Sequence, residues 1–159
     1  MAIVANFTPQ VAGSSQLADY TGWIDVLSIS CGLYSPVSVD GGGMSAGKSS
    51  LSEIAVTVNS GKHMPEIVKQ GTGGKHFDKI EFVFLKQTGD ATPQKYKSIV
   101  VEQAYVTSHN DPTSADDPGY EHLSIACAKM TTEYFEQNAQ GGLVSAGTAS
   151  YDTKTGQTS

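Results

Sequence analysis

The sequence has few cysteines and no apolar run long enough to cross a membrane. Its 159 residues include two cysteines, Cys31 and Cys127. Each lies in an apolar stretch, which favours buried free thiols, although a disulfide stays open because their separation is unknown. No stretch approaches the roughly 20 apolar residues that span a bilayer, and residues 1–20 lack the basic and apolar regions of a secretory signal. We therefore expect a chain made in the cytosol, without membrane insertion.

Positive charge is also scarce. Ten Lys and Arg residues face 16 Asp and Glu residues, which gives a formal net charge of −6. A chain without a cationic excess has little with which to neutralise phosphates, and it is repelled by an anionic membrane surface. We expect no nucleic-acid partner.

Catalytic and cofactor motifs are missing as well. The sequence has no P-loop, no dinucleotide-binding glycine pattern, no nucleophile elbow and no zinc-protease motif. Its four histidines share no metal-ligand spacing. A weak divalent-ion site is conceivable around His109 and His122, but a solvated acidic loop is the favoured interpretation of the carboxylates nearby, Asp111, Asp116, Asp117 and Glu121. We predict no catalytic residues, no metal and no cofactor.

The segments that are present predict one mainly β domain over residues 1–159. A turn is expected over residues 88–93, and a polar tail begins at about Ala139. Ser60–Gly71 is the one helical candidate, with Ser60 as N-cap, Pro65 in the first turn, and Gly71 or Gly73 at its end. An all-β sandwich or barrel is predicted from these strand candidates: Ala2–Val11, Trp23–Val39, Leu51–Asn59, His76–Gln87, Lys95–His109 and Leu123–Phe135.

The stretch Trp23–Ser52 organises the rest of the chain. Its first half, up to Val39, predicts one long strand, because β-branched and aromatic residues alternate with small polar ones such as Ser28 and Ser30. Its second half, Asp40–Ser50, is a glycine-rich arm without apolar periodicity. Such a segment cannot bury enough apolar area to order itself. It is either an arm that reaches a neighbouring subunit or a flexible surface loop, and both interpretations stay open.

Five ordered segments resemble one known family. They are WIDVLSIS, GGGMSAGKSSLSEIAVT, SGKHMPEIVKQ, FDKIEFVFLKQTGD and QKYKSIVVEQAYVTS, and the later IACAKMTTEYFEQNAQGG resembles the same family's C-terminal hairpin. Together they are similar to the haemolysin co-regulated protein (Hcp) family, the tube subunit of type VI secretion. The resemblance implies a β-barrel of two antiparallel sheets with one short helix. It further implies homo-hexameric rings stacked into a tube, which a contractile sheath expels with a spike protein and effectors.

This resemblance suggests roles for particular residues. Ser28 and Ser30 are expected to face the lumen and its effectors. The arm is expected to contact the next subunit or ring through Asp40, Gly41, Gly42, Gly43, Met44, Ser45, Gly47 and Lys48. The chain would be cytoplasmic before firing and extracellular afterwards. The alternative is a monomeric β-sandwich binding module, of adhesin or carbohydrate-binding type, which would cluster exposed aromatic residues at one loop end.

Overall fold

The computed structural model describes residues 1–87, 89 and 92–159. Part of the turn expected over residues 88–93 therefore lies outside the described residues. No helix among the described residues is long and apolar enough to cross a membrane. The elements, in chain order, are β1 (Ala2–Thr8), β2 (Ile24–Ser30), β3 (Leu33–Tyr34), β4 (Val37–Asp40), β5 (Gly43–Ala46), β6 (Ser50–Leu51), β7 (Ile54–Asn59), α1 (Met64–Thr72), β8 (Phe77–Lys86), β9 (Gln94–Asn110), β10 (Tyr120–Gln137), β11 (Leu143–Asp152) and β12 (Gln157–Thr158).

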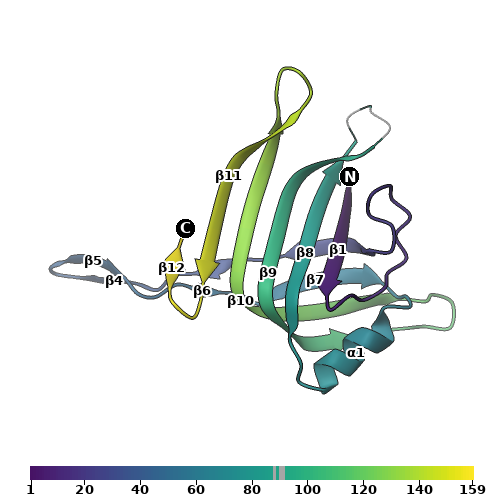
Figure 1. Ribbon diagram of the computed structural model, residues 1–159. Coiled ribbons are helices and arrows are strands. Elements are labelled where there is room, and N and C mark those ends of the chain that lie inside the picture. The colour runs from purple at the N-terminus through teal and green to yellow at the C-terminus, as the bar shows by residue number, and fades with distance from the viewer. Residues whose placement is uncertain (88, 90–91) are drawn as a thin grey trace.

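Six strands close into an antiparallel barrel, which confirms the predicted fold class. Their order is β10-β7-β2-β1-β8-β9, and the pairing of β9 with β10 completes the ring. The long strands β9 and β10 make closure possible because each pairs with more than one other strand. The first part of β10, Tyr120–Ile125, pairs with β7, whereas Lys129–Gln137 pairs with β11. Figure 1 shows β8, β9, β10 and β11 rising as one tall sheet above the barrel.

The barrel interior is filled by alternating apolar side chains. In β7, Ile54, Val56 and Val58 are buried while the residues between them are exposed or half-buried. Phe77, Ile80 and Phe82 of β8 are completely buried in the same cluster. Burying a side chain of this size stabilises the folded state by about 1.5–3 kcal/mol. The period-two pattern of the sequence thus becomes one closed core.

Helix α1 covers one end of the barrel (Figure 1). Ile67 is its one completely buried residue, and it joins the barrel core. Pro65 lies in the first turn and Gly73 follows the last residue, as predicted. The predicted N-cap is wrong: His63 occupies that position. The Ser60 hydroxyl instead donates a hydrogen bond to Asp111, 2.9 Å away.

The long strand predicted over Trp23–Val39 is wrong, because it is broken twice. Strand β2 ends at Ser30, and the chain continues through the short strands β3 and β4. Within β2 the register against β7 shifts between Val26 and Ser28. This β-bulge inserts one residue, so the inward-facing parity changes from Ile24 and Val26 to Ile29.

The polar stretch after Ala139 contains a ten-residue strand, β11. Strand β11 pairs antiparallel with β10 from Lys129↔Asp152 to Gln137↔Leu143. Its first seven residues are exposed. Strand β11 is held by backbone hydrogen bonds to β10. It therefore does not need the apolar residues by which a strand is recognised in a sequence.

Candidate functional site

The predicted arm, Asp40–Ser50, overlaps with a two-stranded β-hairpin that is formed by β4 and β5 and projects from the barrel (Figure 1). From here on, the arm means this hairpin together with the residues up to Ser50. Strands β4 and β5 pair from Val37↔Ala46 to Asp40↔Gly43, which leaves Gly41 and Gly42 as a two-residue turn. Gly43 has a φ of +135°, a conformation open to glycine but rarely to other residues. The Asp40 carboxylate accepts a hydrogen bond from the N–H of Gly42, 3.2 Å away. Regular pairing therefore extends into the glycine-rich segment, where the sequence showed no periodicity.

The arm is amphipathic although all of β4 and β5 is exposed. Directly paired residues in antiparallel strands share a face, so Val39 and Met44 lie together, as do Ser38 and Ser45 on the opposite face. The two serine hydroxyls are 2.7 Å apart. Val39 and Met44 are each 76% exposed. An isolated two-stranded hairpin is marginally stable in water, so this apolar face is one that a second surface would stabilise.

The base of the arm is tied to the rest of the chain. Strands β3 and β6 pair at Leu33↔Leu51, and the N–H of Gly47 donates to the carbonyl of Pro36, 2.7 Å away. The Tyr151 hydroxyl of β11 donates to the carbonyl of Ser49. The Lys48 side chain runs beside Gly156, where an added Cβ would lie 3.5 Å from Lys48 Cε. The arm therefore leaves the body in a defined direction.

Ser28 and Ser30 are both exposed. They pair with Thr57 and Ala55 of β7, and those residues pair in turn with His122 and Ser124 of β10. The six side chains share one face of three adjacent strands, all of them small or polar. Thr57 Oγ1 lies 3.2 Å from His122 Nδ1. This patch is hydroxyl-rich, as the sequence indicated.

A buried ionisable cluster lies near the start of α1, and sequence reasoning missed it. Glu121 is completely buried and both of its carboxylate oxygens are occupied. Oε1 lies 2.8 Å from Nε2 of His109 and Oε2 lies 2.8 Å from Nε2 of His63. The N–H of Gly61 also donates to Oε2, at 3.2 Å. The expectation that Glu121 belongs to a solvated acidic loop is therefore wrong, and barrel closure rather than sequence spacing brings the three groups together.

The cluster does not form a metal centre, and the cysteines do not form a reactive pair. Within residues 1–87, 89 and 92–159, no group of three His, Cys, Asp or Glu side chains is placed to hold a metal ion. Both cysteines are free; Cys31 is exposed, which corrects the prediction that it is buried, and Cys127 is half-buried. Burial raises the pKa of the Cys127 thiol to about 11, so it is protonated and unreactive near neutral pH.

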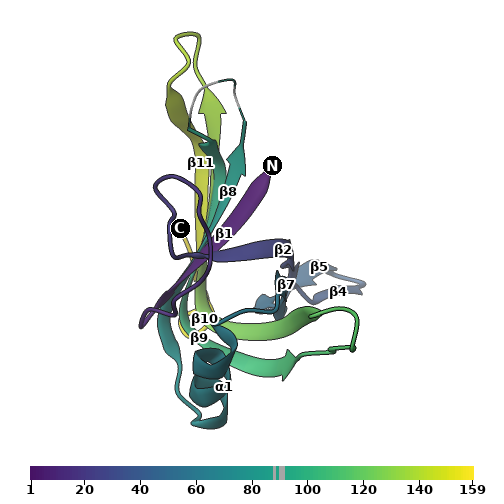
Figure 2. The same cartoon turned by 90° about the vertical axis from the view of Figure 1, so that its right-hand side faces the viewer.

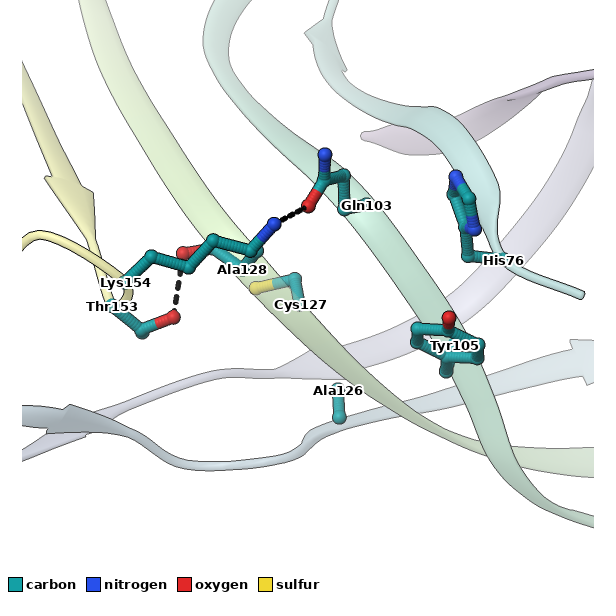
Figure 3. A pocket seen from close by; sticks show the side chains of 8 residues that line it. All are labelled: His76, Gln103, Tyr105, Ala126, Cys127, Ala128, Thr153 and Lys154. Atoms are coloured by element: carbon teal, nitrogen blue, oxygen red, sulfur yellow. Dashed lines mark hydrogen bonds between the residues drawn. The ribbon is translucent and has the colours of Figure 1, made fainter.

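A cavity of about 520 Å³ lies between β9, β10 and the turn before β12. Figure 3 shows Lys154 reaching Gln103, and the Thr153 hydroxyl donating to the carbonyl of Ala128, 2.7 Å away. The His76 and Tyr105 rings are 5.6 Å apart, centre to centre. Cys127 also lines the cavity, but its protonated thiol makes it a poor nucleophile.

Comparisons with known proteins agree with this geometry. A family described as "Type VI secretion system effector, Hcp" matches residues 4–134. A solved structure of a type six secretion system protein has 20% identity and a TM-score of 0.86, with 99% of each chain covered. Hcp1 from Salmonella typhimurium has 21% identity and a TM-score of 0.75, with 99% of this chain and 98% of that chain covered. A type VI secretion system effector from Yersinia pestis has 22% identity and a TM-score of 0.73, with 94% and 98% covered.

Among curated proteins, none matches this sequence. At these identities the solved structures establish a shared fold, over nearly the whole length of each chain. The family match covers most of the chain and includes the barrel, the arm and α1. The chain therefore belongs to the Hcp family of type VI secretion proteins.

Proposed function

We propose that this chain is a structural subunit of a type VI secretion tube, in which six copies close into a ring and the rings stack. Family membership supports the tube role. In a ring of identical subunits each interface joins two different surfaces of the same chain. The chain needs a projecting surface and a receiving surface, and the arm is the projecting one.

The exposed apolar face of the arm is the observation that carries this proposal. Val37, Val39 and Met44 are between 56% and 76% exposed and lie on a hairpin that extends away from the barrel (Figure 2). Contact with a neighbouring copy would remove this face from water, which stabilises association by about 25 cal/mol per Å² of apolar area buried. The direction of the arm, fixed at its base by Tyr151, reduces the entropy lost on contact.

The polar patch around Ser28 and Ser30 would line the lumen in the assembled tube. Small hydroxylated side chains offer hydrogen bonds without an apolar surface that would trap a passing effector. The tube would be assembled in the cytoplasm, surrounded by a contractile sheath and capped by a spike protein. Sheath contraction would then move it out of the cell, with effectors carried inside.

Light scattering on a sizing column, followed by negative-stain imaging, tests the ring directly. We expect a mass near six subunits and ring-shaped particles, with longer stacks at higher protein concentration. Deletion of Gly41–Gly47 should abolish stacking or ring formation. A monomer at high concentration would contradict the tube proposal and favour a monomeric binding module.

Paired substitutions on the two faces of the arm sharpen this test. The double variant Val39→Ser/Met44→Ser removes the two most exposed side chains of the apolar face and should abolish stacking or ring formation. The matched control Ser38→Ala/Ser45→Ala changes the opposite face and should assemble like the unmodified chain. Equal loss of assembly in both variants would mean that the apolar face is not the contact.

A tryptophan at position 28 tests the lumen assignment. If Ser28 faces the lumen, Ser28→Trp rings should form with unchanged mass and show added density in the central hole. Failure of Ser28→Trp to form rings, while the barrel stays folded, would instead place this residue at a contact between subunits.

A further inference from the structure

The cluster of Glu121, His63 and His109 links α1 to the paired strands β9 and β10, which come later in the chain. Glu121 is at the start of β10, His109 is near the end of β9, and His63 is the N-cap of α1. The side chains of His63 and His109 are 5% and 16% exposed, and that of Glu121 is fully buried. Nε2 of His63 lies 2.8 Å from Oε2 of Glu121, and Nε2 of His109 lies 2.8 Å from Oε1, so one buried carboxylate contacts both rings. The cluster is one of the two anchors of the helix.

The second anchor is Ile67, and it is the one completely buried side chain of α1. The neighbouring Val68 is 37% exposed. Between α1 and β9 lies a cavity of about 280 Å³, lined by Ile67, Val68, Val106 and His109 among others. A nine-residue helix is not stable in water without tertiary contacts. Weakening the His63 contact therefore leaves α1 with little to hold it.

Protonation of His63 is unfavourable in its folded position for two geometric reasons. The imidazole sits at the N-terminus of α1, where the helix dipole is positive and disfavours a cation. From the packed elements, the ionisable groups that act on His63 are Glu121 and His109. One carboxylate then faces two imidazoles, and protonation of both gives the buried cluster a net positive charge. On its own segment, Lys62 is exposed and Glu66 is in the first helical turn.

We propose that the His63–Glu121–His109 cluster is a pH-sensitive latch, which loosens α1 from the end of the barrel in mildly acidic solution. Burial lowers the pKa of His63 below its ordinary value of 6.5, although Glu121 opposes this shift. A loosened helix exposes the imidazole, which then binds a proton more readily than in the docked state. The docked helix is thus favoured above pH 6.5, and this advantage is lost as the pH falls from 6.5 through the folded pKa.

Hydrogen exchange of residues 61–73 at pH 7.5 and pH 5.5, corrected for intrinsic exchange rates, tests the latch. We expect the opening equilibrium of this segment to increase on acidification, by at most about tenfold, because pH 5.5 lies one unit below the ordinary pKa of 6.5. In His63→Gln this response should disappear. His122→Gln is the matched control, because His122 is exposed and pairs on the Ser28 face, and it should respond like the unmodified chain. An unchanged opening equilibrium in the unmodified chain, or a full response in His63→Gln, would overturn the proposal.

Nuclear magnetic resonance of the unmodified chain provides a second test that does not depend on a variant folding. The His63 ring should titrate with a midpoint below 6.5, and amide signals of α1 should change with the same midpoint. A midpoint at or above 6.5, or α1 signals that do not follow the titration, would overturn the latch.

Discussion

In the barrel and in the arm alike, apolar residues alternate with polar ones along the strands. The two regions differ in whether those apolar side chains are buried. In the barrel, Phe82 and Ile80 are completely buried because β8 is paired on both sides and its inner face meets the other strands. In the arm, Val39 and Met44 have the same alternation and remain 76% exposed. An apolar stripe on a strand therefore marks a surface that is stable when it is covered. In the barrel the other strands of the same chain cover it, whereas in the arm no strand within the described part of the chain does.

Removing a core side chain should produce the largest effect. Phe82→Ala deletes a completely buried ring, and we expect the free energy of unfolding to fall by about 3–5 kcal/mol. Urea unfolding, under conditions where the chain is monomeric, measures this change. Met44→Ala is the control in the arm and should leave the unfolding midpoint nearly unchanged. A similar loss in both variants would mean that the arm packs against its own barrel.

Glycine substitutions test the same contrast in the backbone. A Cβ added at Gly13 would lie 2.1 Å from the carbonyl oxygen of Trp23, whereas one added at Gly41 would meet nothing within 4 Å. We expect Gly13→Ala to lower the free energy of unfolding by about 1–3 kcal/mol because neighbouring backbone must shift. Gly41→Ala should be close to neutral. The melting temperatures of the two variants, measured by thermal unfolding, test this difference. Equal melting temperatures would contradict the close approach of Gly13 to the Trp23 carbonyl.

The sequence predicted those parts of the fold that depend on local pattern. The strand Lys95–His109 and the helix around Ile67 were found because their apolar residues recur with the period of the element. Of the strand predicted over Leu51–Asn59, the part from Ile54 onward is confirmed as β7, whereas Leu51 belongs to the separate strand β6. The break of β2 was not found. A β-bulge changes the inward-facing parity by one residue, and nothing in the sequence around Leu27 marks that insertion.

The sequence indicated where the arm is, but it indicated neither the pairing within the arm nor the buried cluster around Glu121. Glycine content drew attention to the arm, but the Val39↔Met44 pairing was missed because a hairpin of four-residue strands is too short to show periodicity. The contact between His63 and Glu121 joins elements that barrel closure brings together. No local spacing encodes such a contact.

The pH dependence of stability should be smaller than either substitution effect. Because burial lowers the pKa of His63 in the folded chain, the unfolded chain binds the proton more readily below pH 6.5. Folding stability should therefore fall between pH 7.5 and pH 5.5, by at most about 1.4 kcal/mol for each pKa unit of lowering. Urea unfolding at a series of pH values measures this slope, and His63→Gln should reduce it. A slope that is the same in both chains would assign the dependence to other groups.

The smallest expected effect on stability is at the arm, and it is the most informative about function. Val39→Ser changes an exposed side chain, and exposed substitutions usually alter the free energy of unfolding by less than about 0.5 kcal/mol. We expect the urea midpoint of monomeric Val39→Ser to match that of the unmodified chain, while light scattering shows weaker assembly. The two measurements together separate folding from association, because in the barrel the same kind of substitution would affect both. If Val39→Ser assembles normally, Val39 is not part of the contact between subunits. If its urea midpoint is clearly lower, Val39 packs against the barrel of its own chain.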